Sequence, residues 1–397
     1  MKSRTIMLIA GEPSGDALGG QLIEGLRALA PVGLRIVGVG GARMRSAGLQ
    51  SLFSLDDTSV MGLREVVPRL PRILLRMRQA ANFAIKQQPD IVVLIDSPDF
   101  THNVAKRIRK RAADLKLVDY VAPQVWASRP KRAAQMAKYF DHVLCLLPFE
   151  VPFFANVGLP ATFVGHPVIE RAPDPGAGAA FRVRHGIKAE EKLLALLPGS
   201  RLSEVRFLWP VFRAAVEQTQ AATGPLKVVI PTVPTVAARI RQLAAEWGDD
   251  VLVTQDQQDK FGAFESADAA LAASGTVSTE LALAATPMVI GYRVGQVTAA
   301  IARRYIKVPY ITLVNLILKR EAIPEFVQEE CTSENLSAEL IKLLTNPSAR
   351  VAQVTASAQA VKALGFGDEK PSIRAARAIL KLLDEPKEKK TAPKGAA

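Results

Sequence analysis

The sequence predicts an α/β protein built from two doubly wound domains, each with a parallel sheet. Short, continuous apolar runs alternate with longer helical patterns along most of the 397 residues. The alternation pauses at a turn-rich stretch over residues 167–180 and then resumes. Continuous apolar strands alternating with helices are typical of a parallel sheet covered on both faces, and the length suits two domains.

The first half of the chain supplies the first predicted domain, over residues 1–170. Its expected strands are 6–10, 34–39, 91–95, 117–121 and 142–146. Its expected helices include 18–29, 72–86 and 103–113. The stretch 167–180, with three prolines and several glycines, is interpreted as the linker between domains.

The second half repeats the pattern and supplies a second predicted domain, over residues 171–346. Its expected strands are 193–197, 227–230, 251–253, 269–272 and 288–290. C-terminal helices follow over residues 347–383, and residues 384–397 read as a disordered basic tail. Two arrangements stay open for these helices: packing back on the first domain, or packing on a second copy in a homodimer.

Composition restricts the compartment and the partner. The first apolar run, 6–10, is too short for a secretory signal, and prolines interrupt the long apolar stretch 143–165, so we expect no spanning helix. Two widely separated cysteines favour a reducing, cytoplasmic setting. The net charge of +13 favours an anionic partner, either nucleic acid, anionic lipid or a phosphorylated substrate.

Two polar loops follow strands of the first predicted sheet. Glu12, Ser14 and Asp16 lie directly after the first strand, where they either cap a helix or face a ligand. Asp96 and Asp99 follow the strand 91–95, and a carboxylate placed there can accept a proton from an acceptor hydroxyl. The alternative for Asp99 is a helix cap.

The second predicted domain carries two loops suited to phosphate. Ser200 and Arg201 open a helix after the strand 193–197, and the arginine fork matches phosphate oxygens. A second helix begins near Ser274, Gly275 and Thr276, with Glu280 one turn further along in reach of ribose hydroxyls. We therefore predict a nucleotide or phosphate site here. The four histidines have no metal-ligand spacing, so we expect no metal.

An apolar stripe between arginines occupies residues 63–78. Its apolar members recur at helical spacing: Leu63, Val66, Val67, Leu70, Leu74 and Met77. Such a stripe usually makes core contacts, whereas neighbouring arginines such as Arg72 and Arg76 are typical of an interfacial segment. Both interpretations stay open. Pro68 and Pro71 predict a loop leading into a helix rather than one continuous helix.

An ordered set of short motifs resembles the lipid-A-disaccharide synthase family over nearly the whole chain. The motifs are GEPSGD at 11–16, SVMG at 59–62, DSPDF at 96–100, QVWA at 124–127, LPFE at 147–150, VGHP at 164–167, LPGSR at 197–201, SGT at 274–276 and QEEC at 328–331. No single motif is unique, but the ordered set is specific. Gln124 and Ser128 depart from the residues commoner in the family.

The resemblance implies a GT-B fold, with two domains facing a cleft, and an inverting transfer without metal or cofactor. The implied donor is UDP-2,3-diacylglucosamine and the implied acceptor is 2,3-diacylglucosamine 1-phosphate, giving the β(1→6)-linked disaccharide 1-phosphate and UDP. Asp99 is then the expected base, with Glu12 the next candidate. Arg201 and residues 275–276 would stabilise the departing UDP, and Glu280 would hold the ribose. Asn315, Gln328 and Glu329 match positions on the family's cleft side.

The same resemblance implies a lipid surface as a partner, at the cytoplasmic face of the inner membrane. Other readings are a UDP-N-acetylglucosamine epimerase or peptidoglycan glycosyltransferase, a non-catalytic nucleotide-sugar sensor, and a nucleic-acid-binding protein. No helix-turn-helix, zinc or aromatic-stacking signature supports the last of these, so we expect no nucleic acid.

Overall fold

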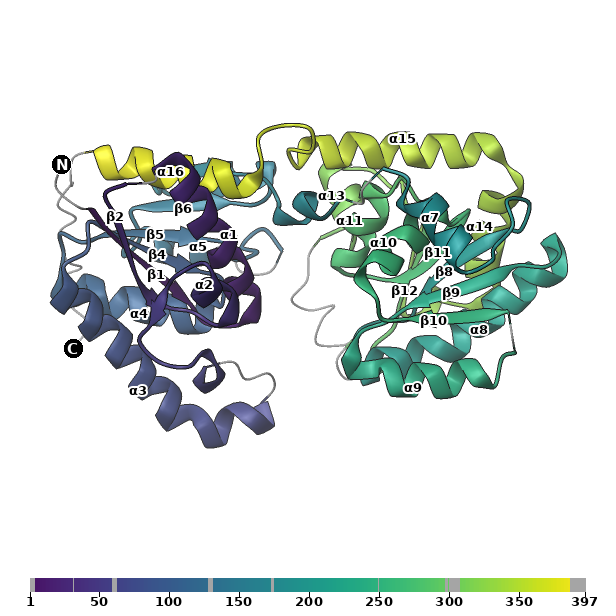
Figure 1. Cartoon of the computed structure of the whole chain (residues 1–397), viewed down its shortest axis with the longest axis horizontal. Coiled ribbons are helices and arrows are strands. Elements are labelled where there is room, and N and C mark those ends of the chain that lie inside the picture. Colours follow the sequence, from purple (N-terminus) through teal and green to yellow (C-terminus); the bar gives the residue numbers. More distant parts are fainter. Residues whose placement is uncertain are drawn as a thin grey trace. The chain divides into compact units, whose positions relative to one another are not determined.

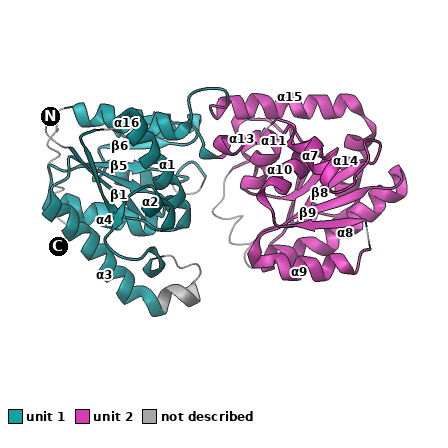
Figure 2. Cartoon of the chain, in the orientation of Figure 1, with its two compact units in different colours: residues 1–167, 367–397 teal, residues 168–366 magenta. Residues whose placement is uncertain are grey.

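The computed structural model describes residues 4–30, 32–58, 63–127, 131–172, 175–248, 250–296, 299 and 308–385, with the side chains of 63–67 outside the described set. The chain divides into two compact units. Residues 1–167 and 367–397 form the first unit and residues 168–366 form the second (Figure 2). Each unit has its own parallel sheet and its own apolar core, as the sequence predicts.

In the described part of the first unit, a seven-stranded parallel sheet has the order β3-β2-β1-β4-β5-β6-β7 (Figure 1). Its strands are β1 Arg4–Ala10, β2 Leu34–Val39, β3 Gln50–Ser51, β4 Ile91–Ile95, β5 Lys116–Tyr120, β6 His142–Cys145 and β7 Ala161–Phe163. The predicted strands are confirmed. The sequence analysis missed β3 and β7 because two or three residues are too few to show an apolar run.

Helices cover both faces of this sheet. They are α1 Pro13–Leu29, α2 Ala42–Ser46, α3 Leu63–Gln87, α4 Pro98–Arg111, α5 Lys131–Met136, α6 Val151–Ala155 and α16 Pro371–Asp384, with short 3-10 helices at Leu55–Asp57, Pro148–Glu150 and Pro167–Arg171. Helices α3 to α6 pack in one apolar layer, and α1, α2 and α16 pack in the other. Alternate residues of each strand enter the two layers, because side chains alternate across a sheet.

Helix α3 runs without a break through Pro68 and Pro71, so the predicted loop before a shorter helix is wrong. A proline ring fixes φ near the helical value, and its cost in a helix comes from one missing hydrogen bond and crowding of the preceding turn. Both prolines lie on the exposed side of α3, where water can satisfy the freed carbonyls. The amphipathic pattern therefore outweighs the two helix-breaking residues.

The last helix, α16, lies beside α1 of the same chain (Figure 1). The two helices approach so closely that a Cβ on Gly25 would lie 2.8 Å from the carbonyl oxygen of Ser372. Ala375, Ala376 and Ile379 complete the apolar layer there. The chain thus leaves the first unit at Pro167 and returns to it at Gly367.

In the described part of the second unit, a six-stranded parallel sheet has the order β10-β9-β8-β11-β12-β13. Its strands are β8 Leu193–Leu197, β9 Lys227–Pro231, β10 Val251–Thr254, β11 Ala269–Ala273, β12 Met288–Tyr292 and β13 Glu325–Val327. All strands predicted for this half are confirmed, and the three-residue β13 was missed.

The helices of the second unit are α7 Ala177–Arg184, α8 Leu202–Thr223, α9 Pro234–Ala245, α10 Gln257–Ser266, α11 Thr276–Leu283, α13 Leu313–Leu318, α14 Ser333–Thr345 and α15 Pro347–Ala363, with a 3-10 helix at Gln328–Glu330. Helices α8, α9 and α14 pack on one face of the sheet, and α7, α10, α11, α13 and α15 pack on the other. Helix α7 begins inside the stretch predicted as linker, and α15 belongs to the second unit whereas α16 belongs to the first.

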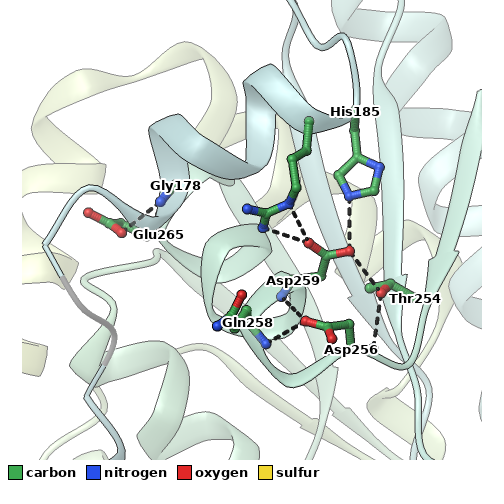
Figure 3. Close-up of polar contacts among 8 residues, drawn as sticks. Gly178, His185, Thr254, Asp256, Gln258, Asp259 and Glu265 are labelled. Atoms are coloured by element: carbon green, nitrogen blue, oxygen red, sulfur yellow. Dashed lines mark hydrogen bonds and ion pairs between the residues drawn. The ribbon is translucent and has the colours of Figure 1, made fainter.

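Polar contacts fix α7 against α10 (Figure 3). The Asp259 carboxylate accepts hydrogen bonds from Arg184 at 2.7 Å and pairs with His185 Nε2 at 3.0 Å. Asp256 caps α10 by accepting from the backbone amides of Gln258 and Asp259. Burial favours a raised pKa for Asp259, but the contacts with Arg184 and His185 outweigh it, and the pKa is lowered.

A buried carboxylate follows β6 in the first unit. Glu150 is 2% exposed, and it accepts hydrogen bonds from the backbone amide of Leu147 at 3.0 Å and the indole of Trp126 at 3.2 Å. Burial raises the pKa of Glu150 to about 7, although both hydrogen bonds act in the opposite direction. A pKa raised in the folded state contributes stability below the unfolded value of 4.5, and that contribution is lost as the pH rises through about 7.

We therefore expect a pH-dependent difference between the wild type and Glu150→Gln. As the pH rises from 4.5, the pKa of this group in the unfolded chain, to about 8, the free energy of unfolding of the wild type should fall relative to that of the variant by on the order of 3 kcal/mol. Urea unfolding at a series of pH values measures this difference. Glu24→Gln, on the exposed side of α1, is the matched control and should track the wild type. Parallel curves for wild type and Glu150→Gln would contradict the prediction.

Candidate active site

Two neighbouring loops at the carboxyl edge of the first sheet bring the predicted acidic residues together. Strands β1 and β4 are paired, with Ala10 opposite Ile95, so the loops that follow them lie side by side. A Cβ on Gly11 would lie 2.7 Å from the Cβ of Ser97, which is why glycine is required there. Asp96 and Ser97 have φ values of 55° and 46°. Such left-handed backbone costs about 1–3 kcal/mol per residue and is typical of functional sites.

Hydrogen bonds and shared charge connect the carboxylates of these loops. Ser14 Oγ donates to Asp96 Oδ2 at 2.6 Å, and the backbone amide of Ser97 donates to Asp96 Oδ1 at 2.8 Å. Partial burial and the neighbouring charge of Asp96 raise the pKa of Glu12, with a further contribution from Asp99, while the hydrogen bond with Ser14 acts to lower it. Glu12, Asp96 and Asp99 therefore form one electrostatic cluster that suits proton transfer.

Asp99 lies in the first turn of α4 with its side chain 100% exposed. Ser97 holds the position before the helix, and none of the described residues donates a hydrogen bond to the Asp99 carboxylate. Oδ1 lies 3.8 Å from Nη2 of Arg132, which belongs to α5. Asp99 is thus a carboxylate open to a ligand and accompanied by one cation.

Asp16 caps a helix, which is one of the two roles that the sequence left open, but the helix is α2 and not its own helix α1. Its carboxylate is 5% exposed and accepts hydrogen bonds from the backbone amides of Gly41, Arg43 and Met44 at 2.7, 2.9 and 3.0 Å. These amides belong to the start of α2, which has no other side-chain cap among the described residues. The structure therefore uses Asp16 to hold α2 against α1 and does not present it at the surface with Glu12.

The loop after β8 presents the guanidinium of Arg201. Glu204 Oε2 accepts from the backbone amides of Ser200 and Arg201 at 2.9 and 3.2 Å, which folds the loop back on α8. Gly199 has a φ of 113°, and a Cβ there would lie 2.5 Å from the Cβ of Glu204. Arg201 Nη1 lies 2.9 Å from Glu204 Oε1, yet the side chain stays 66% exposed and can reach an anion.

The loop after β11 leads into α11. Strand β11 is the neighbour of β8, so this loop lies at the same sheet edge as Arg201. Ser274 Oγ donates to the carbonyl of Ile311 at 3.2 Å, and α11 begins at Thr276, directly after Gly275. Glu280, on α11, is 3% exposed, with Lys260 Nζ at 2.6 Å and Arg171 Nη1 at 3.7 Å. The sheet edge thus combines a helix N-terminus, an exposed arginine and a paired carboxylate.

Comparison with known proteins identifies the family. A family model described as lipid-A-disaccharide synthetase matches residues 6–379. The chain belongs to this family. It is similar to the lipid-A-disaccharide synthases of Rhodospirillum centenum, at 48% identity over 96% of both chains, and of Ruegeria pomeroyi, at 46% identity over 94% of both chains. The predicted family resemblance is confirmed.

Solved structures with the same fold include enzymes that act on other substrates. The calicheamicin glycosyltransferase CalG4 matches with a TM-score of 0.59 and 17% identity, over 96% of this chain and 99% of that one. MurG of Acinetobacter baumannii matches with a TM-score of 0.56 and 16% identity, over 95% and 99%. A putative UDP-N-acetylglucosamine 2-epimerase from Listeria monocytogenes has a TM-score of 0.61 and 12% identity, over 98% and 100%. At such identities the likeness shows the fold alone, which is GT-B.

Family membership decides the activity class. The enzyme is a glycosyltransferase that synthesises the lipid A disaccharide, which removes the sensor and nucleic-acid readings. The epimerase reading fails for the same reason, although that enzyme class shares the fold. Within the described residues, His, Cys, Asp and Glu nowhere gather in threes as a metal ion would require.

One residue predicted on the donor side, Asn315, serves the structure of the protein itself. Asn315 is fully buried; its amide donates to the carbonyl of Ile323 and to Glu325, and its oxygen accepts from the backbone amides of Ala322 and Ile323. Asn315 therefore shapes the segment before β13.

Gln328 and Glu329 follow β13. Gln328 has a φ of 56°, and its side-chain amide lies 3.2 Å from the backbone nitrogen and oxygen of Val294. Glu329 is exposed on the 3-10 helix 328–330. Both lie at the sheet edge that carries Arg201, because β13 continues the same parallel sheet.

Sequence reasoning missed three cations that accompany the predicted carboxylates. They are Arg132 beside Asp99, and Lys260 and Arg171 beside Glu280. None of the three lies within a motif that suggested it. Only the packing of α5, α10 and the 3-10 helix 167–171 brings them to their partners.

The outer side of α3 combines exposed leucines with arginines. Leu70, Leu74 and Leu75 are 46%, 38% and 51% exposed, and Arg69 and Arg78 are exposed on the same helix. In the part of the chain that the structure describes, none of the helices is long and apolar enough to span a membrane.

Other members of the predicted stripe serve packing. Met77 is buried in the core, so for this residue the core interpretation holds. Arg72 and Arg76 pair with Asp57 at 2.8 and 2.5 Å, and Arg76 also stacks on Phe53. The side chains of Leu63, Val66 and Val67 lie outside the described residues.

Proposed function

We propose that the enzyme transfers the sugar of UDP-2,3-diacylglucosamine to the 6-hydroxyl of 2,3-diacylglucosamine 1-phosphate. The product is the β(1→6)-linked disaccharide 1-phosphate, with UDP released and the anomeric configuration inverted. The observation that carries the proposal is the carboxylate cluster of Glu12, Asp96 and exposed Asp99 in the first unit of a family member. A single-displacement transfer needs one base at the acceptor hydroxyl, and this cluster supplies it.

Asp99 is the proposed base, and Ser14 with Asp96 holds the neighbouring loop in shape. Proton transfer leaves Asp99 protonated as the acceptor oxygen attacks the anomeric carbon and the bond to UDP breaks. Glu12 is the second candidate, because burial and the charge of Asp96 raise its pKa, and a raised pKa makes its carboxylate a stronger base. On the donor side, Arg201 and the N-terminus of α11 are proposed to stabilise the diphosphate.

We propose that Glu280 holds the ribose. Its pairing with Lys260 at 2.6 Å gives the carboxylate a fixed position and a compensating charge. A fixed acceptor can receive hydrogen bonds from two adjacent hydroxyls without reorganising. Ser200, Ser274, Gln328 and Glu329 line the same edge of the sheet and are proposed to complete the donor site.

The test is UDP release from the acylated donor, measured with and without the acylated acceptor phosphate, in the presence and absence of EDTA. Acceptor-dependent release that survives EDTA supports the reaction and its independence from metal. Release without acceptor would indicate donor hydrolysis, and loss of release with EDTA would contradict the metal-free transfer. Proton NMR of the new glycosidic bond establishes the configuration.

We also propose that the exposed side of α3 contacts the cytoplasmic face of the inner membrane. Both proposed substrates carry acyl chains, and Leu70, Leu74 and Leu75 would enter the lipid while the arginines contact anionic headgroups. The net charge of +13 favours the same surface. A homodimer stays a prediction, which light scattering of the purified enzyme tests.

Replacing Leu70, Leu74 and Leu75 together by serine should weaken binding to anionic vesicles at least about tenfold, since burying each leucine contributes about 1 kcal/mol or more. Vesicle co-sedimentation measures the binding, and thermal unfolding should change little. Val183→Ser with Val351→Ser is the control, since these valines are 83% and 65% exposed in the other unit. Unfolding of the triple variant, or unchanged binding, would count against the α3 surface.

A further inference from the structure

A buried carboxylate lies beneath the proposed catalytic edge and takes no part in the chemistry described above. Asp119, on β5, is 1% exposed, and neither of its oxygens accepts a well-formed hydrogen bond from the described residues. Strand β5 pairs with β4, and Asp119 lies opposite Leu94 of that strand. Strand β4 leads to Asp96 and α4. An unbonded buried carboxylate is costly, so its retention calls for a reason.

The imidazole of His102, on α4, faces the Asp119 carboxylate. His102 Nε2 lies 3.4 Å from Asp119 Oδ1, and both side chains are almost fully buried. The other ring nitrogen, Nδ1, lies 3.1 Å from the hydroxyl of Tyr139. His102 is one helical turn beyond Asp99, so this buried pair fixes the turn of α4 that follows the proposed base.

The charge of Arg132, on α5, also acts on the buried Asp119. Arg132 is 22% exposed and lies 3.8 Å from Asp99 Oδ1. Burial raises the pKa of Asp119, and the charges of His102 and Arg132 both act to lower it. The same Arg132 charge acts on the hydroxyl of Tyr139. Arg132 therefore pairs with exposed Asp99, and its charge also acts on buried Asp119.

We propose that Arg132 is a positioning residue for Asp99, and that the buried Asp119–His102 pair fixes the part of α4 that carries Asp99. The Asp99 side chain is fully exposed, so packing does not restrict its rotamers. A guanidinium that is itself three-quarters buried limits this freedom and leaves the other carboxylate oxygen for the proton. The inference rests on the proposed role of Asp99 and assigns Arg132 no contact with substrate.

The test compares Arg132→Ala, Arg132→Lys, Asp119→Asn and Asp99→Ala, and combines Arg132→Ala with Asp99→Ala. We expect Arg132→Ala to lower kcat about 10-fold to 100-fold, with KM for the acceptor nearly unchanged. Arg132→Lys should restore part of kcat. Asp119→Asn should lower kcat with KM for the acceptor nearly unchanged, and it should also lower thermal stability, since it removes one partner of a buried pair. Lys131→Ala, exposed on the same helical turn, is the control.

The decisive comparison is made without Asp99. If Arg132 acts through Asp99, Arg132→Ala should cause no further loss in the Asp99→Ala variant. A further loss there, or a rise in acceptor KM for Arg132→Ala, would show that Arg132 binds substrate instead and would overturn the inference. If Asp99→Ala collapses and Arg132→Ala keeps full kcat, the inference alone fails. If Asp99→Ala keeps full turnover, the base assignment fails and the inference with it.

Discussion

Replacing Asp99 by alanine should lower kcat for disaccharide formation about 10²-fold to 10⁴-fold, the usual contribution of a general base. The acceptor hydroxyl is a weak nucleophile unless its proton is removed as it attacks. The structure leaves the Asp99 side chain fully exposed at a sheet edge that also holds Glu12 and Asp96. Because the carboxylate is fully exposed and Ser97 occupies the cap position of the helix, the fold should survive its removal.

Steady-state UDP release measures this effect, with thermal unfolding as the check on folding. Asp114→Ala, an exposed aspartate just beyond α4, is the matched control and should keep full activity. Full turnover by Asp99→Ala would exclude it as the base and transfer the role to Glu12. Glu12→Gln would then be expected to show the large loss, since the amide cannot accept the proton.

Replacing Arg201 by alanine should lower kcat/KM about 10²-fold to 10³-fold, the size found when one preorganised charge-stabilising donor is removed. The leaving UDP gains negative charge as the glycosidic bond breaks. Arg201 is 66% exposed, and Glu204 fixes its direction through Nη1 and through the backbone of the loop. A fixed guanidinium at a helix start stabilises that charge without reorganising.

Competition by UDP provides a second readout for Arg201. If the guanidinium holds the diphosphate, the inhibition constant for UDP should rise together with the loss of kcat/KM. Arg201→Lys should recover only part of the activity, because lysine lacks the planar fork. Arg239→Ala, exposed on α9, is the control. Unchanged UDP inhibition in Arg201→Ala would place the diphosphate elsewhere in the second unit.

Much of the fold follows from local pattern. Runs such as 91–95 and 193–197 are apolar at every position, so they are stable only where both faces of a sheet are covered. The order of the strands within each sheet comes from the structure alone. The short strands β3, β7 and β13 escape this reasoning, because neighbouring strands rather than their own residues define them.

Helix α3 shows the opposite limit. Pro68 and Pro71 are strong local signals for an interruption, yet the helix continues. The gain from burying Ile73, Met77 and the alanines beyond them is made by the whole helix and exceeds the loss of two hydrogen bonds on its exposed side. The cost of the two prolines is fixed and local, whereas the stabilisation from packing is shared by the whole helix and is larger.

For the site, the sequence by itself determined which loops carry the polar residues, since parallel strands place their carboxyl ends at one edge of a sheet. Glu12, Asp96 and Asp99 were brought together in this way. The tertiary structure alone decided which side chains are free. The side chains of Asp16 and Asn315 are hydrogen-bonded to backbone groups of other segments, which the fold brings near them. Arg132 and Lys260 reach their carboxylates for the same reason. The strands and the loops that follow them are encoded locally, whereas the partner of a charged side chain depends on contacts between distant segments.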